Sequence, residues 1–190
     1  MIKLAVILAA GVSKRLNNAP PGRPKGFVNI GGETLISRSI ACLKKHGIER
    51  ILIGTGYGAS LYEQLAEYVP EIITCKCRYY RTTGSFYTLY NMRNLIQEDF
   101  LLLESDLIYE ERAISQLLRC GSADTILASG RTYSKDEVYI QADADSMLVN
   151  MSKDETVLQS VCGELVGISK FSAHRPCGSC AHCLKTTKTF

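Results

Sequence analysis

The chain has 190 residues, of which 46% are hydrophobic and 22% are charged, a composition typical of one globular domain with a buried core. Residues 173–190 carry three basic and no acidic side chains, which leaves 19 basic and 19 acidic residues before them. This balance argues against a nucleic-acid-binding surface. No apolar stretch is long enough to span a bilayer and no signal peptide is visible, so we expect a cytoplasmic protein with no membrane partner.

Strand-like and helix-like patterns alternate along most of the chain. Short apolar runs predict buried strands at residues 4–8, 50–54, 72–75, 100–103 and 125–128. Apolar residues at helical spacing predict helices over residues 35–43, 60–69, 85–96 and 114–118, with Thr34 and Ser60 as N-caps of the first two. This order predicts an α/β fold built on a doubly wound, mostly parallel sheet with helices on both faces.

The pattern changes in the last third of the chain. Residues 138–141, 147–151 and 164–168 are strand-like, and the turn sequence Asp143-Ala144-Asp145 joins the first two with no helix between them. We therefore expect a small antiparallel addition to the parallel sheet. The apolar periodicity stops near Ser172, so residues 1–172 are predicted to form the domain and residues 173–190 a tail outside its fold.

The most informative segment is LAAGVSKR, residues 8–15, which directly follows the first apolar run. A strand that ends in a glycine-containing loop exposes backbone N–H groups that can bind phosphate. Arg15 and Lys25 add positive charge at this loop, and we interpret them as clamps for a triphosphate. The alternative is that both are solvated surface charges. The segment matches neither the Walker sequence nor the dinucleotide-binding fingerprint.

Ligands of open α/β sheets bind at the carboxyl ends of the strands, where two further loops of interest are expected. One holds Gly56, and the other holds Asp106, just beyond an apolar strand. We interpret Asp106 as a ligand of the Mg²⁺ that accompanies a nucleotide, because this ion binds carboxylates together with phosphates. The alternative is that Asp106 caps the helix that contains Ile114.

Each of three polar residues has two possible roles. Ser85, which follows Gly84, is either the N-cap of a helix or part of a segment that reads a nucleobase, and the two roles are compatible. Lys153 is either a turn lysine or a group that reaches a second, anionic substrate. Glu164 is either an exposed strand charge or the partner of a substrate cation.

The chain contains eight cysteines, a high number for its length. Five are spread through residues 42–162 and are interpreted as small buried hydrophobic residues. The other three, Cys177, Cys180 and Cys183, have metal-ligand spacing and with one histidine are chemically able to hold zinc. We expect no metal site there, because the second half of a zinc module is missing.

Longer runs of sequence resemble one group of enzymes. The segment from Leu8 to Gly11, with Arg15 and Pro24-Lys25, is similar to the signature loop of the nucleotidyltransferases that activate small phosphorylated compounds. Other runs resemble the 2-aminoethylphosphonate cytidylyltransferases, which are related to the phosphocholine cytidylyltransferases. These runs lie at residues 24–27, 53–56, 83–85, 100–109, 126–130, 136–139 and 163–170, so the resemblance covers nearly all of residues 1–172.

The resemblance implies a fold like that of the nucleotide-diphospho-sugar transferases. It also implies a reaction that transfers CMP from CTP to 2-aminoethylphosphonate, releases pyrophosphate and uses Mg²⁺ as cofactor, with a homodimer as an open option. Arg15, Lys25 and Asp106 are the expected catalytic residues, and Asp106 is the expected metal ligand. We expect the nucleotide at Leu8, Ala10, Gly11, Ser13, Gly56, Gly84 and Ser85, and the second substrate at Lys153 and Glu164.

Several alternatives stay open. A phosphocholine acceptor calls for an aromatic cage, and aromatic residues do cluster around Gly84, at Tyr79, Tyr80, Phe86, Tyr87 and Tyr90. A sugar phosphate is a weaker rival. Similar enzymes continue to a second metal-binding aspartate, whereas residues 173–190 contain no acid, so we expect a truncated or frame-shifted end and impaired activity. A catalytically silent nucleotide-binding protein and a metal-binding interaction module are the remaining alternatives.

Overall fold

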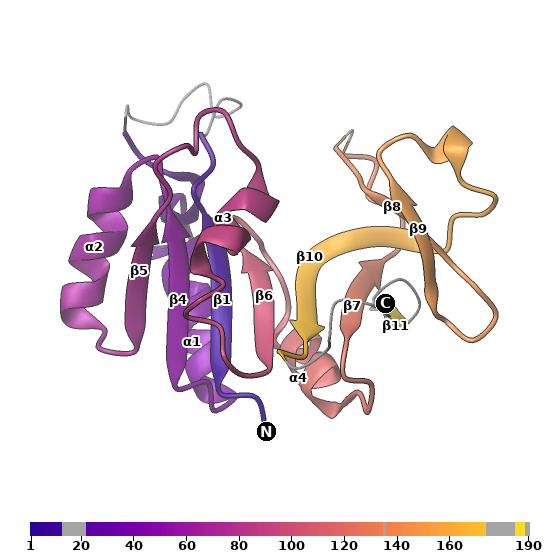
Figure 1. Ribbon diagram of the computed structural model, residues 1–190, viewed down its shortest axis with the longest axis horizontal. Helices are drawn as coiled ribbons and strands as arrows, with labels where there is room; N and C mark the ends of the chain where they lie inside the picture. The colour runs from indigo at the N-terminus through magenta and orange to yellow at the C-terminus, as the bar shows by residue number, and fades with distance from the viewer. Residues whose placement is uncertain (13–21, 135, 174–184, 189–190) are drawn as a thin grey trace. The chain divides into compact units, whose positions relative to one another are not determined.

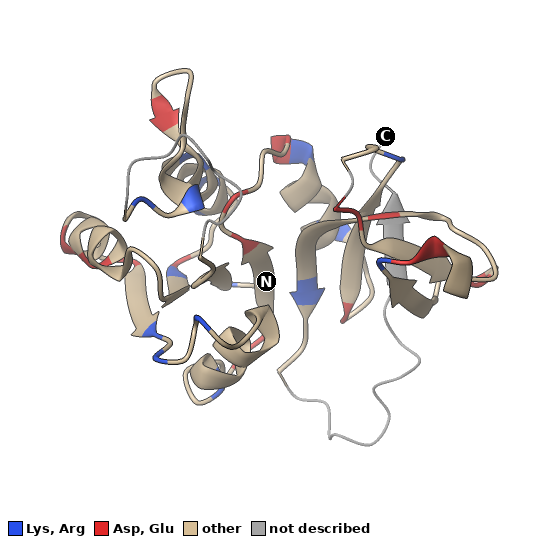
Figure 2. Ribbon diagram, turned by 90° about the horizontal axis from the view of Figure 1, so that it is seen from above, with Lys and Arg blue, Asp and Glu red and all other residues tan. Residues whose placement is uncertain are grey.

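The computed structural model describes residues 1–12, 22–134, 136–173 and 185–188. The chain divides into two units, Met1–Tyr109 and Glu110–Phe190, and each is described by itself (Figure 1). Basic and acidic residues are interspersed in each of them (Figure 2).

The first unit is built on four parallel strands in the order β6-β1-β4-β5. The strands are β1 (Leu4–Ala9), β4 (Arg50–Thr55), β5 (Ile72–Lys76) and β6 (Phe100–Glu104). Three helices connect them, α1 (Leu35–Lys45), α2 (Ala59–Tyr68) and α3 (Ser85–Met92). Figure 1 shows α3 in front of the sheet and α1 behind it, so helices cover both faces as predicted.

Short elements fill the long connection between β1 and α1. They are the 3₁₀ helix η1 (Lys25–Phe27) and the two-residue strands β2 (Asn29–Ile30) and β3 (Glu33–Thr34), which pair with each other. Thr34 caps α1 as predicted, because its hydroxyl accepts a hydrogen bond from the Ser37 N–H at 3.2 Å. The connection that carries Lys25 therefore leads into a capped helix.

The core of the first unit lies on both faces of β1, whose six residues are all buried. Strands that are covered on both faces are continuous apolar runs, and LAVILA and FLLLE are runs of this kind. The largest fully buried side chains in this unit include one polar residue, Tyr62 of α2.

The second unit combines one helix with a mainly antiparallel set of strands. Its elements are α4 (Glu111–Arg119), β7 (Thr125–Ser129), β8 (Tyr139–Ala142), β9 (Leu148–Ser152), the 3₁₀ helix η2 (Glu155–Val157), β10 (Gly163–Phe171) and β11 (Lys185–Lys188). β10 is antiparallel to both β7 and β8, and β8 is antiparallel to β9. The predicted antiparallel addition and its turn are confirmed, since the Asp143 carboxylate accepts the N–H groups of Asp145 and Met147 at 3.0 and 2.8 Å.

Some boundaries differ from the predictions. The N-cap of α2 is Gly58, with φ of 65°, and not Ser60, because a left-handed residue starts the helix two positions earlier. α3 ends at Met92, and turns replace the predicted continuation to residue 96. β11, in the predicted tail, pairs in parallel with β7. No helix in the described part of the chain is long and apolar enough to cross a membrane.

Candidate active site

A cavity of about 220 Å³ opens at the carboxyl ends of β1 and β6 in the first unit. The strand register explains its position, because Leu8 of β1 lies beside both Gly54 of β4 and Glu104 of β6. The loops that follow these strands therefore begin at the same level of the sheet. The cavity is lined by Leu8, Ala9, Ala10, Gly11, Val12, Pro24, Lys25, Tyr80, Thr83, Gly84, Ser85, Thr88, Glu104, Ser105 and Asp106.

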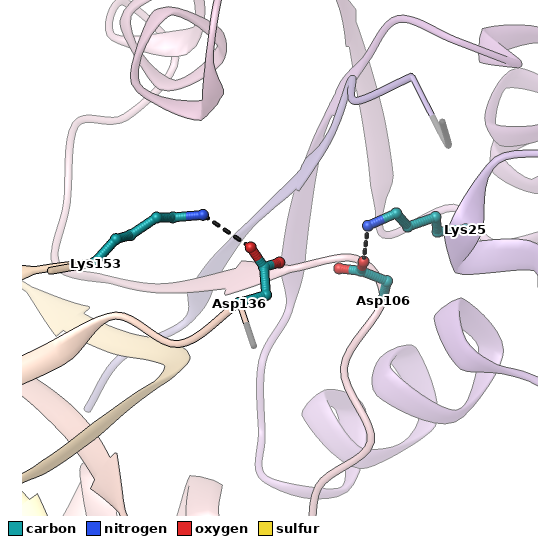
Figure 3. Close-up of polar contacts among 4 residues, drawn as sticks. All are labelled: Lys25, Asp106, Asp136 and Lys153. Carbon is teal, nitrogen blue, oxygen red and sulfur yellow. Dashed lines mark hydrogen bonds and ion pairs between the residues drawn. The ribbon is translucent and has the colours of Figure 1, made fainter. Parts of the chain in front are cut away.

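An ion pair joins the two predicted catalytic residues that the structure describes. Lys25 Nζ lies 2.7 Å from Asp106 Oδ2, and the two side chains are 36% and 29% exposed (Figure 3). Lys25 is the first residue of η1, which follows Pro24, and Asp106 follows β6. The cavity thus contains one cation and one carboxylate in direct contact, at the edge where a phosphate ligand is expected.

Backbone groups of the β1 loop complete the floor of the cavity. The Leu8 carbonyl accepts the Ser105 N–H at 3.2 Å, and the Ala10 carbonyl accepts the Tyr57 N–H at 3.2 Å. These bonds hold the end of β1 to the loops that follow β6 and β4. A Cβ on Gly11 would meet nothing within 4 Å, so the backbone there is open toward the cavity.

Glu104 is a second carboxylate of the cavity. Burial, and to a lesser extent the nearby charge of Asp106, raise its pKa to about 7, while hydrogen bonding from Ser85 and the charge of Lys25 act in the opposite direction. Among the described residues that line the cavity, Lys25 is the one cation beside these two carboxylates.

The loop before α3 and the start of that helix form one wall of the cavity. Gly84 is the N-cap of α3 without a side-chain bond, and Ser85 is its first residue, so Ser85 is not the N-cap. Ser85 instead hydrogen-bonds the Glu104 carboxylate. Asn91 Nδ2 donates to Cys77 Sγ at 3.7 Å, which fastens α3 to the segment after β5.

Gly56 packs against the cavity residues Tyr80 and Ala10 and does not itself line the cavity. A Cβ at Gly56 would lie 2.7 Å from the Ala10 carbonyl oxygen and 2.6 Å from the Tyr80 ring. No side chain fits there, so the glycine allows Tyr80 to lie close to the β1 loop. Gly56 is therefore placed as a packing residue of the site.

The other predicted site residues fall into two groups. Ser13 and Arg15 lie outside the described residues. Lys153 and Glu164 belong to the second unit and are described within it. Lys153 Nζ pairs with Asp136 Oδ1 at 2.9 Å at an exposed position (Figure 3), whereas Glu164 is buried and accepts hydrogen bonds from the Thr132 N–H and hydroxyl at 2.9 and 2.7 Å.

The alternative role of Asp106 as a helix cap is wrong. The N-cap of α4 is Glu110, which makes no side-chain capping bond, and Asp106 lies four positions earlier in the chain. The predicted cysteine cluster of the tail lies outside the described residues. Among the five cysteines that the structure describes none forms a disulfide, and only Cys77 is fully buried.

Sequence reasoning missed Glu104, which lines the cavity, and the buried Tyr62 and Gly26 beside it. Glu104 stands two positions before Asp106. Side chains two positions apart in an extended segment lie on the same side, so this spacing could have indicated Glu104. Tyr62 is fully buried below the Lys25 loop, and only its helical spacing to Leu65 and Ala66 marks it as a core residue.

The sequence matches the family model of the MobA-like NTP transferase domain over residues 5–167. It is 25% identical over 155 residues to the CMP-5'-(3-aminopropyl)phosphonate synthase of Streptomyces rubellomurinus, a match that covers 79% of this chain and 24% of that protein. It is 25% identical over 113 residues to the 2-aminoethylphosphonate cytidylyltransferase of Lancefieldella rimae, covering 59% of this chain and 46% of that protein. The chain thus spans less than half the length of these curated relatives.

The fold is similar to that of the CTP:phosphocholine cytidylyltransferase of Streptococcus pneumoniae, with a TM-score of 0.71 and 23% sequence identity over 90% of this chain and 72% of that one. The predicted α/β fold and the predicted resemblance are both confirmed by these matches. With the family model covering most of its length, the chain belongs to the MobA-like NTP transferase family.

Proposed function

We propose that this protein transfers CMP from CTP to 2-aminoethylphosphonate and releases pyrophosphate. The observation that carries the proposal is the contact between Lys25 and Asp106, with Nζ 2.7 Å from Oδ2, inside the cavity at the carboxyl ends of the strands. One residue supplies a cation for phosphate oxygens and the other a carboxylate for a metal ion. Names of similar proteins, which include phosphonate cytidylyltransferases, support this choice of reaction.

The chemistry of the transfer matches the residues of the cavity. A phosphonate oxygen attacks the α-phosphorus of CTP, the bond from that phosphorus to the bridging oxygen breaks, and pyrophosphate leaves with the electron pair. The attacking oxygen is already ionised, so no general base is needed. The obstacle is the approach of one anion to another, and Lys25 and the open backbone near Gly11 are suited to reduce that repulsion. Arg15, expected from the sequence as a second clamp, lies outside the described residues.

The donor set fits an Mg²⁺ ion that arrives with the triphosphate. Within the described residues no three His, Cys, Asp or Glu side chains gather into a complete metal site. Mg²⁺ in nucleotide enzymes is commonly held by one or two protein carboxylates together with substrate phosphates and water, and Asp106, with Glu104 beside it, meets that requirement. Bound there, the ion would neutralise charge that develops on the phosphates.

The aromatic residues around Gly84 favour a primary ammonium over choline. The guanidinium of Arg93 lies 3.9 Å from the centre of the Tyr90 ring, and that of Arg81 lies 5.5 Å from the centre of the Tyr80 ring. An arginine therefore already occupies one face of each of these two rings, whereas a choline cage needs ring faces that are open to the quaternary ammonium of choline. Phosphocholine stays the second candidate, because Tyr79, Tyr87 and Tyr90 form a chain of ring contacts.

The test is pyrophosphate release from CTP and Mg²⁺ with 2-aminoethylphosphonate and with phosphocholine in parallel. Release with the first acceptor alone supports the proposal, and release with phosphocholine alone identifies that acceptor instead. CTP binding without release in either reaction would contradict catalysis and favour a silent nucleotide-binding protein.

Variants of the ion pair tie the activity to the cavity. We expect Lys25→Met to lower kcat by about 10²- to 10³-fold, the usual loss when one group that stabilises transition-state charge is removed. Lys44→Met is the matched control, because Lys44 forms a similar, partly exposed ion pair with Glu71 at 2.6 Å and does not line the cavity. An equal loss in both variants would separate the activity from this site.

A further inference from the structure

Tyr62 of α2 is a fully buried tyrosine whose hydroxyl is poorly explained by packing alone. Its side chain is 0% exposed, and its ring meets the Phe27 ring edge-on with the centres 4.9 Å apart. The hydroxyl makes no hydrogen bond of normal geometry to any described residue. A phenylalanine would fill the same ring volume without burying an unsatisfied polar group, which is destabilising.

The hydroxyl lies between the two loops that carry Lys25 and Asp106. A Cβ on Gly26 would lie 2.7 Å from the Tyr62 hydroxyl oxygen and 3.1 Å from the Ser105 carbonyl oxygen. Burial raises the pKa of Tyr62 to about 12, and the Ser105 side chain and the Gly26 backbone are close enough to oppose that rise. The hydroxyl thus stands beside the residue after Lys25 and the residue before Asp106.

We propose that Tyr62 is a positioning residue. Its hydroxyl fixes the spacing of the Lys25 and Asp106 loops for the bound nucleotide. The inference rests on the proposed function and extends it to a residue outside the cavity. Gly26 is required in this arrangement, because any side chain there would collide with the hydroxyl. The neutral O–H is both a donor and an acceptor, and its polar neighbours, the Ser105 side chain and the Gly26 backbone, belong to the two loops.

This role makes a prediction about the kinetics of Tyr62→Phe. The variant keeps the ring and its contact with Phe27 but loses the hydroxyl that lies between the two loops. We expect kcat to fall about tenfold and the Mg²⁺ concentration that gives half-maximal rate to rise severalfold, because misplacement of a charged pair by a fraction of an ångström weakens its contacts to the transition state. We expect the KM for the acceptor to stay within about twofold, because the acceptor does not contact this residue.

Tyr109→Phe is the matched control. The Tyr109 hydroxyl is also buried without a hydrogen bond of normal geometry in the described chain, and burial also raises its pKa to about 12. Its polar neighbours are Ser39 and Cys42 of α1, and it does not line the cavity. We expect its kcat and Mg²⁺ dependence to equal those of the wild type. Equal kinetics in Tyr62→Phe and the wild type would overturn the proposal.

A second measurement needs no ligand and no turnover. Gly26→Ala should lower the urea midpoint of the wild type, and Tyr62→Phe should restore much of that loss because the colliding oxygen is gone. An equal shift in both backgrounds would refute the contact on which the proposal depends. If the wild type releases no pyrophosphate, the proposed function fails by itself, and these midpoints still decide whether Tyr62 sets the loop spacing.

Discussion

Glu104 and Asp106 place two carboxylates on one small cavity, and Lys25 contacts only the second of them. Two neighbouring anions repel each other, and the more buried one lowers that repulsion by keeping its proton. Burial, which disfavours the charged carboxylate, is the main reason that the pKa of Glu104 rises to about 7, and the repulsion from Asp106 adds to it. The charge of the cavity therefore changes near neutral pH when no metal ion is present.

The raised pKa predicts a pH dependence of stability. The folded protein binds a proton at Glu104 up to about pH 7, whereas the unfolded chain releases it near the ordinary value of 4.5, so the free energy of unfolding should fall as pH rises through this window. Glu104→Gln should remove that part of the decline and be the more stable protein above pH 7. Urea midpoints in EDTA across this range measure the effect.

The control for this prediction is Glu67→Gln, at an exposed position of α2. It should leave the pH dependence as it is in the wild type. Parallel curves for the wild type and Glu104→Gln would contradict the assigned environment of Glu104.

At the level of single residues, a site residue can be predicted from the sequence when its type and its position along the chain indicate the same role. Lys25 follows the predicted phosphate-binding loop, Asp106 follows an apolar strand, and the structure brings the two together. Tyr62 could not be identified, because a tyrosine in an amphipathic helix has the same pattern whether its hydroxyl reaches solvent or another loop. Gly26 was also missed, since its role depends on Tyr62, 36 positions later.

Among the elements, α3 depends on one glycine for its contact with the sheet. A Cβ on Gly54 of β4 would collide with Thr88 Cγ2 and would lie 2.8 Å from Met92 Cε. Met92 has flexible bonds, but Thr88 is β-branched and is held to one or two rotamers in a helix. The helix can therefore approach β4 this closely only because Gly54 has no side chain.

We expect Gly54→Ala to displace α3 and to lower the free energy of unfolding by about 1–3 kcal/mol, the usual cost of overpacking a core. Because Thr88 lines the cavity, nucleotide affinity should fall as well. Urea denaturation and CTP binding measure the two effects. Gly121→Ala is the control, since a Cβ there meets nothing within 4 Å, and a similar loss in both variants would contradict the role of Gly54.

Strands were predicted more accurately than helices, for a physical reason. β1 and β6 are apolar without interruption because both faces are covered, and this signal needs no tertiary context. The length of α3 did need such context, because residues 93–96 favour a helix by composition but turn away after Met92. The start of α2 depends on a left-handed Gly58, which no periodicity reveals.

For the whole molecule, the sequence predicted one domain followed by a tail outside its fold, and β11 gives a way to test that division. The backbone of Lys185–Lys188 pairs with β7, whose first four residues are buried. If this pairing stabilises the second unit, removal of residues 174–190 exposes the N–H and C=O groups of a buried strand edge, which promotes association between chains.

We therefore expect the chain that ends at residue 173 to have a lower urea midpoint and to form larger species in size-exclusion chromatography with light scattering. The chain that ends at residue 188 retains β11 and serves as the control. Unchanged behaviour of the shorter chain would instead agree with a tail that takes no part in the fold.

The buried Cys77 has a practical consequence. Its N–H donates to the Thr55 carbonyl at 2.7 Å, its sulfur accepts from Asn91, and its side chain is 1% exposed, so a thiol reagent can reach it only when α3 and the segment after β5 separate. The rate at which a thiol reagent labels Cys77 therefore measures how often the cavity wall opens, and the measurement needs no substrate turnover. A nucleotide that bridges Gly84 and the β1 loop should lower this labelling rate, whereas a nucleotide that binds elsewhere should leave it unchanged.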